Sequence, residues 1–205
     1  MYTSLHNHTD YSNALLGFPD SVNKTEYLIQ RAYDLGLRGV SITDHEGISN
    51  HIIADKYFKS MQLDRPFTLT LGNEIYLMSE QEDVNNRDSE SDLHTPYYHF
   101  LLNSLDMVGH KQIRELSSRA WFRAYTYKGL MRRPTYYKDL EEIVGSNKGH
   151  VIGSSACLGG YLPKEILKWK LEGNQQSCEN VQNFIKWCIS VFGHRSRTPR
   201  DILVY

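Results

Sequence analysis

The amino-acid sequence predicts an α/β fold in which short β-strands alternate with α-helices. Apolar runs of strand length, such as residues 38–43 and 151–155, are separated by segments whose apolar residues recur at helical spacing. This order is typical of parallel βαβ units, which wind right-handedly into a barrel or an open sheet. With 205 residues, the chain is long enough for one large domain with a buried core.

The first half of the chain contains three predicted strands and two predicted helices. A short strand over residues 2–5 is followed by a loop over residues 11–21. Asn23 is then a helix N-cap, with Glu26 completing a capping box, and Gly36 ends this helix. A strand over residues 38–43, a helix over 48–61 and a strand over 67–71 follow, and the last continues through residues 75–77.

The second half repeats the alternation after one interruption. Residues 79–95 carry six acidic side chains and little apolar surface, which predicts a solvated loop. A strand is expected over residues 97–103, helices over 113–121 and 136–144, and a strand over 151–155. Two further helices, over residues 163–171 and 179–191, complete the prediction.

Composition excludes several classes of protein. The chain is 40% hydrophobic and 23% charged with a formal net charge of −1, so bulk charge supplies no attraction for nucleic acid. The sequence shows neither an apolar run of the roughly 18 residues that a membrane span needs nor a signal-peptide pattern, so a cytoplasmic protein is expected. Three cysteines at unrelated spacings predict no disulfide framework.

Residues with metal-binding chemistry follow the predicted strands. His6 and His8 are two apart, so a strand end would aim both imidazoles the same way, and imidazole suits zinc, manganese and iron. Other candidates are expected near the ends of later strands: His45, Glu74, His99 and Cys157. Because strand ends converge on one face of an α/β barrel, these side chains predict a metal centre there.

The simpler interpretation of each residue stays open at this point. His99 could be a hydrogen-bonded core histidine, and Cys157 could be a small buried apolar residue. The remaining histidines are interpreted as surface or locally hydrogen-bonded residues: His51, His94, His110, His150 and His194.

Several motifs occur in the order of a known family. They are His6-x-His8-Thr-Asp-Tyr-Ser, Ile42-Thr43-Asp44-His45, Gly72-Asn73-Glu74, Tyr98-His99-Phe-Leu-Leu and Ser154-Ser155-Ala156-Cys157-Leu158-Gly159-Gly160. Over residues 1–193 the chain resembles the PHP (polymerase and histidinol phosphatase) domain, in the version found at the N-terminus of the bacterial DNA polymerase III α subunit. This resemblance implies a distorted (β/α)₇ TIM-like barrel with up to three divalent metal ions, which could be zinc, manganese or iron.

The resemblance also implies roles for individual residues. His6, His8 and Glu74 would hold one metal, and Glu74 would bridge to a second metal held by His99 and Cys157. His45 would serve a third metal, with Asp20 as its partner. Asp44 would orient an imidazole or a metal-bound water, and Asp44 and Glu74 are the predicted catalytic residues.

The implied activity is metal-dependent phosphoester hydrolysis, including 3′→5′ exonuclease proofreading in DNA replication. DNA and replication proteins would be its partners, with Arg132 and Arg133 as weak candidates for nucleic-acid contact beside the alternative of a solvated face. Two alternatives remain: a catalytically inactive structural or metal-stabilised module, and a histidinol-phosphatase-like phosphomonoesterase. No polymerase activity is expected from this chain alone, and its oligomeric state is not predicted.

The C-terminal region departs from the family pattern. The family closes its site with a late Asp-x-His pair, whereas Asp201 and His194 are the only such residues after Cys157 and are not at that spacing. Residues 194–205 read as a divergent basic tail. The barrel is therefore expected to lack its last strands, through truncation, frameshift or a genuine short variant, and at least one metal is expected to lack a ligand.

Overall fold

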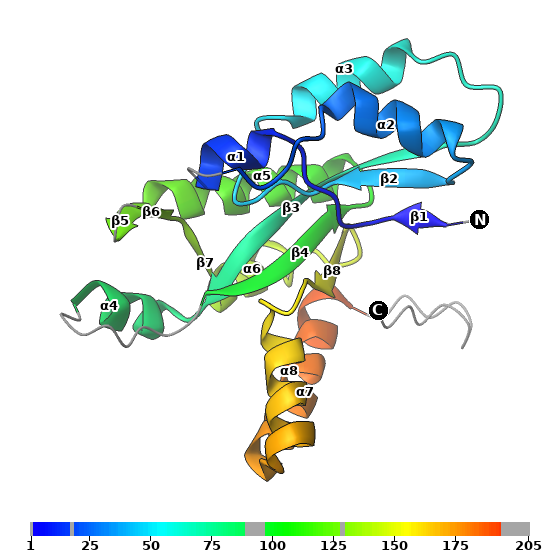
Figure 1. Cartoon of the computed structure of the whole chain (residues 1–205). Helices are drawn as coiled ribbons and strands as arrows, with labels where there is room; N and C mark the ends of the chain where they lie inside the picture. The colour runs from blue at the N-terminus through cyan, green and yellow to red at the C-terminus, as the bar shows by residue number, and fades with distance from the viewer. Residues whose placement is uncertain (1, 17–18, 89–96, 128–129, 194–205) are drawn as a thin grey trace.

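The computed structural model describes residues 2–16, 19–88, 97–127 and 130–193 (Figure 1). The strands are β1 (Thr3–Ser4), β2 (Gly39–Ile42), β3 (Thr68–Met78), β4 (Tyr98–Ser104), β5 (Tyr125–Tyr127), β6 (Leu130–Arg132), β7 (Pro134–Tyr136) and β8 (Val151–Ser155). The helices are α1 (Tyr11–Leu16), α2 (Thr25–Asp34), α3 (His51–Ser60), α4 (Glu80–Asp88), α5 (Met107–Phe122), α6 (Tyr137–Ile143), α7 (Tyr161–Glu172) and α8 (Gln175–Phe192). The predicted tail, residues 194–205, lies outside the described residues.

Six strands form one curled, mixed sheet in the order β1-β2-β3-β4-β8, and β7 joins it on β3. The long strand β3 organises this sheet because one of its edges has two successive partners. Residues 68–71 pair with β2, and residues 76–78 pair with β7, both in parallel. The described part of the chain thus forms a half-barrel, and a closed seven-stranded barrel is not observed in it.

The prediction of an all-parallel sheet is wrong for β4. This strand runs antiparallel to both β3 and β8, and its register places His99 opposite Tyr76. As a result, the beginning of β4 lies at the edge of the sheet where β3 ends. His99 therefore reaches the site from the start of its strand, whereas the sequence predicted a site built from strand ends.

Alternation along β3 separates a core face from a site face. Ile75 and Leu77 join the main apolar core, where Phe100 and Leu102 of β4 pack with residues of α5, α6 and α8. Since successive strand side chains point to opposite faces, Glu74 and Tyr76 point to the other side of the sheet. A second core packs β2 against α2 and α3.

Three local predictions near helix ends are wrong. Residues 11–16 form α1 within the predicted loop, and α2 begins after Lys24, whose side chain makes no cap, so Asn23 is not the N-cap. Residues 80–88 form α4, although their acidity predicted a solvated loop. The missed signal is a capping box, because Ser79 N donates to Glu82 Oε2 (2.8 Å) and Glu82 N donates to Ser79 Oγ (3.2 Å).

The last two helices, α7 and α8, lie side by side and project away from the sheet (Figure 1). Gly173 separates them in a left-handed conformation, with φ of 69°, which glycine adopts without steric cost. No helix in the described parts of the chain is long and apolar enough to span a bilayer. The three cysteines are free thiols, as the sequence predicted.

Candidate metal centre

The curled sheet brings five of the predicted ligand residues to one place. His6 and His8 follow β1, and His45 follows β2 and forms a parallel bridge with Glu74 of β3. His99 joins them because β4 is antiparallel to β3. Apart from His6 and His8, these residues are far apart in sequence, so the pairing of their strands makes them neighbours.

Glu74 lies at the centre of this group and is only 1% exposed. Its Oε2 atom is 3.0 Å from His6 Nε2, 2.9 Å from His8 Nε2 and 3.6 Å from His45 Nδ1. Its Oε1 atom is 2.6 Å from His99 Nδ1. The two oxygens of one carboxylate therefore face different imidazoles, which is the arrangement of a carboxylate that bridges two cation sites.

A second group of polar atoms lies on the other side of His8. The Oδ2 atom of Asp20 is 3.8 Å from both His8 Nδ1 and His45 Nε2. The two imidazoles stack with their ring centroids 4.4 Å apart. Three sets of atoms are thus spaced closely enough to share a cation: His6, His8 and Glu74; His8, Asp20 and His45; and His45, Glu74 and His99.

The protonation states suit a cation-binding site. Burial disfavours the charged form of Glu74, but hydrogen bonds from His6, His8 and His99 outweigh it and hold the pKa of this carboxyl well below its usual range. Burial lowers the pKa of His45 to about 4, against the pull of Glu74. At neutral pH the site therefore contains an ionised carboxylate and a neutral His45 imidazole, which are the forms that bind metal.

Two observations show that divalent metal ions fit these residues. The Nδ1 atom of His45 is buried without a hydrogen-bond partner, at a cost that a bound cation would remove. The His6 and His8 Nε2 atoms are 2.9 Å apart. Two ligands bound at about 2.1 Å and at right angles would lie about 3.0 Å apart, so the observed spacing fits adjacent ligands of one ion.

Cys157 is less closely integrated than the other predicted ligands. Its Sγ atom is 3.7 Å from His99 Nδ1 and accepts a hydrogen bond from Gly159 N, and the residue is exposed. It belongs to none of the three sets described above. Its role as a ligand stays a prediction.

Asp44 is buried, and it organises the loop that carries His8. Its carboxylate accepts hydrogen bonds from Thr9 N (2.6 Å), Ser12 Oγ (2.9 Å) and Asn50 Nδ2 (3.0 Å). The Ser12 hydroxyl, which donates to Asp44, lies 3.3 Å from His8 Nδ1. With a metal ion bound at Nε2, this hydrogen-bond chain would hold the proton of a neutral His8 on Nδ1.

The sequence prediction did not assign a role to Ser12, although it stands at a fixed distance after His8 in the first motif. Nor did it assign one to Tyr76, whose ring stacks on His99 with centroids 4.7 Å apart. Burial raises the pKa of Tyr76 well above its usual range, so its hydroxyl stays protonated. A period-two count from Glu74 along β3 would have placed Tyr76 on the same face.

The two arginines proposed for nucleic-acid contact have different surroundings. Arg133 is 4% exposed and pairs with Glu46, so a solvated or DNA-facing position is wrong for this residue. Arg132 is half-buried, with its guanidinium 5.0 Å from the centroid of the Tyr97 ring. Arg132 is the last residue of β6, whereas Arg133 lies between β6 and β7 and turns to Glu46.

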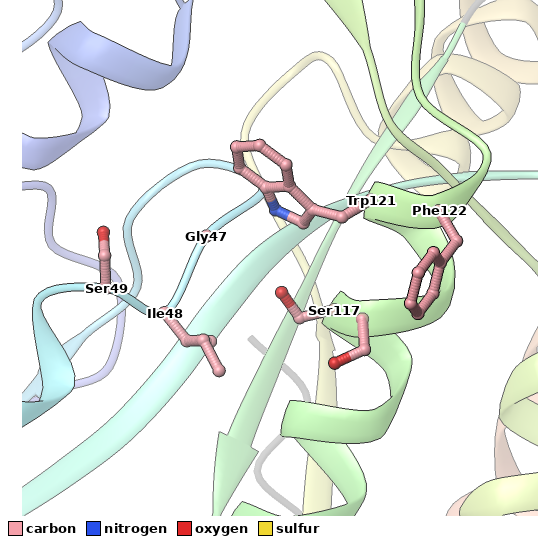
Figure 2. Close-up of a pocket in the computed structure, with 7 residues that line it drawn as sticks. Gly47, Ile48, Ser49, Ser117, Trp121 and Phe122 are labelled. Atoms are coloured by element: carbon pink, nitrogen blue, oxygen red, sulfur yellow. The ribbon is translucent and has the colours of Figure 1, made fainter.

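An apolar hollow of about 530 Å³ lies on another part of the surface. Figure 2 shows Trp121 and Phe122 of α5 on one side of it and residues 47–49, from the loop after His45, on the other. The hollow contains no metal-binding residue, so it is not the candidate site. The hollow adjoins the loop that follows His45, because residues 47–49 form part of its lining.

Comparisons with known proteins identify the family of the chain. The model of the PHP domain family matches residues 4–197. The chain is 40% identical over 200 residues to a DNA-directed DNA polymerase of Bacillus phage SPbeta, covering 92% of this chain and 15% of the relative. It is 28% identical over 193 residues to DNA polymerase III subunit alpha of Borreliella burgdorferi, covering 94% of this chain and 14% of the relative.

The chain thus spans about 15% of the length of such relatives. The solved structure of a candidate metal-dependent phosphoesterase from Bifidobacterium adolescentis aligns with 59% of this chain and 35% of its own. Its 22% identity and TM-score of 0.34 are too low to support an argument. The family match covers nearly all of the chain and includes every residue of the metal centre, so the chain belongs to the PHP domain family.

Proposed function

We propose that this PHP domain is a metal-dependent phosphoesterase within a DNA polymerase III α-type protein. The observation that carries the proposal is Glu74, a buried carboxylate whose two oxygens face His6 and His8 on one side and His99 on the other. A site that gathers ionised carboxylate and neutral imidazole in one buried cluster suits two or three zinc, manganese or iron ions. The natural reaction would be hydrolysis of a DNA phosphodiester, as in 3′→5′ exonuclease proofreading.

Each residue has a part in this proposal. His6, His8 and Glu74 would hold one metal ion, Glu74, His99 and Cys157 a second, and His45 with Asp20 a third. Metal ions bound there would lower the pKa of a water molecule and neutralise charge on the phosphoryl oxygens. Glu74 would keep two ions at a fixed separation, and Asp44 would act through Ser12 to keep the His8 proton on Nδ1.

The proposal extends to partners and architecture. DNA and replication proteins would be the partners, by analogy with the polymerases that the chain resembles, and the cytoplasm is the compartment where they meet. Arg132 is the remaining candidate for contact with a phosphate of the nucleic acid, since Arg133 is buried. The curled sheet is consistent with a distorted (β/α)₇ barrel as the architecture of the domain.

The first experiment is elemental analysis of the purified chain together with hydrolysis of bis-p-nitrophenyl phosphate in the presence of manganese. We expect at least two metal ions per chain and turnover that Glu74→Gln abolishes. Preference for p-nitrophenyl phosphate, a monoester, would favour the histidinol-phosphatase-like alternative. A chain that contains no metal after growth in metal-supplemented medium would contradict the proposal.

A second candidate function is a metal-stabilised structural module. The exposed position of Cys157 favours it, because an incomplete ligand set can bind an ion without activating water. Bound metal without hydrolysis of either ester would support this alternative.

A further inference from the structure

Glu46, which directly follows His45, has an unusual backbone conformation. Its φ of 51° lies in the left-handed region, and it is the only non-glycine residue with positive φ in the described parts of the chain. A side chain in this region strains the backbone, so surrounding contacts must hold it there. The contacts that hold Glu46 in this conformation therefore also fix the backbone next to His45, a proposed metal ligand.

The backbone of Glu46 is hydrogen-bonded at both of its polar groups. Its N–H donates to the carbonyl oxygen of Glu74 (2.8 Å), and its own carbonyl accepts from Trp121 Nε1 (2.9 Å). The N–H of Glu74 in turn donates to the carbonyl of Asp44 (3.1 Å). These bonds fix the two residues that flank His45 against the backbone of Glu74.

The Glu46 carboxylate is held from a third element. Its Oε2 atom pairs with Arg133 Nη1 (2.9 Å), and its Oε1 atom accepts from the backbone N–H of Arg133 (3.2 Å). Both side chains are buried, and the guanidinium lies 4.2 Å from the centroid of the Trp121 ring. Figure 2 shows this Trp121 side chain reaching across the loop at Gly47.

Stability alone does not account for this pair. A buried ion pair contributes little net stability compared with apolar side chains of the same volume, because both charges lose their hydration. Here the pair also keeps a strained residue beside His45. Arg133 directly precedes β7, which pairs with residues 76–78 of β3, so the pair links the His45 loop to the strand that carries Glu74.

We propose that Glu46 and Arg133 are a positioning pair that sets the orientation of the His45 imidazole in the metal centre. The inference rests on the proposed metal site. The pair would act on the ion that His45 binds, and the ion held by His6, His8 and Glu74 would not depend on the pair. Loss of the pair would free the loop to relax, and His45 Nδ1 would move away from Glu74.

The test measures metal affinity in the full chain, using zinc titrated in competition with a chromophoric chelator. Arg133→Met keeps the stem that packs on Trp121 and removes the charge, and Glu46→Gln keeps the volume. Each is expected to weaken at least one zinc site tenfold or more and to leave the tightest site within threefold of wild type. Arg133→Lys, which keeps a cation, is expected to recover part of the loss.

A matched control exists in Asp139, another buried carboxylate that pairs with an arginine, Arg123, and belongs to none of the metal-binding sets. Asp139→Asn should lower the melting temperature and leave every zinc affinity unchanged. If Arg133→Met and Glu46→Gln behave like this control, the positioning role is wrong and the pair is only structural. Glu46→Gln decides the question if Arg133→Met does not fold.

A second readout separates this inference from the proposed function. In the chelator-treated protein, nitrogen-15 NMR of the histidine rings should show that Arg133→Met shifts the His45 signals and leaves those of His6 in place. A wild-type chain without zinc affinity would overturn the proposed function, while the His45 signals would still decide the positioning pair. Unshifted His45 signals would overturn the inference.

Discussion

Replacement of Glu74 by glutamine tests whether metal binding and folding are coupled through one carboxylate. Glu74 is 1% exposed and belongs to two of the three candidate metal-binding sets. An amide has nearly the same volume but lacks the charge, and it offers one acceptor atom where the carboxylate offers two. We expect Glu74→Gln to abolish the stabilisation supplied by the metal ions that bind Glu74 and to change the metal-free protein much less.

The size of the effect follows from binding linkage. A ligand present at 100 times its Kd stabilises the folded state by about 2.7 kcal/mol, so two sites that share Glu74 contribute about 5 kcal/mol. For a chain of this size, 1 kcal/mol shifts the melting temperature by about 2–4 °C. Chelation should therefore lower the melting temperature of the wild type by about 10–20 °C. In the chelated state, loss of the charged hydrogen bonds is offset by relief from burying a carboxylate, so the two proteins should differ by a few degrees.

Thermal unfolding followed by circular dichroism, with manganese and after treatment with EDTA, measures these shifts. The matched control is Glu165→Gln on α7, since Glu165 is also buried and pairs with Lys168 (2.8 Å). It should lower stability in both conditions and retain the full response to EDTA. A Glu74→Gln protein that loses as many degrees with EDTA as the wild type would refute the reasoning.

Three further predictions concern stability in the presence of chelator, each measured by urea unfolding. Leu102→Ala, in the core of β4, should cost about 2–5 kcal/mol, and a loss below 1 kcal/mol would contradict the packing described. Asp44→Asn should cost about 1.5–3 kcal/mol through its hydrogen bonds to Thr9 and Ser12, and an unchanged midpoint would refute that role. Burial lowers the pKa of His51 to about 4. Between pH 6.5 and 4 only the unfolded chain binds this proton, so the free energy of unfolding decreases as the pH is lowered. The expected decrease is about 1.4 kcal/mol from pH 8 to pH 5.5. His51→Gln should remove that part of the pH dependence, and identical slopes would show that His51 is not its source.

Local patterns in the sequence were enough to predict most elements and five of the residues that meet at the candidate metal centre. The spacing of His6 and His8 depends only on the period of a strand, and the motifs around His45 and Glu74 lie within a few residues. These patterns involve residues close together in the sequence, so they are recognisable without knowledge of the tertiary contacts of those residues. The same is true of the capping box at Ser79 that begins α4, which was present in the sequence and was missed.

The tertiary structure alone decided how these parts meet. The direction of β4 depends on hydrogen bonds with β3 and β8, and that direction brings His99 to Glu74. The burial of Arg133 depends on Glu46 and Trp121, which come from two distant elements. Such contacts join residues separated by tens of positions and leave no local periodicity. The sequence by itself therefore determined which side chains could bind metal, while strand pairing decided which of them share one carboxylate and which residues hold them in place.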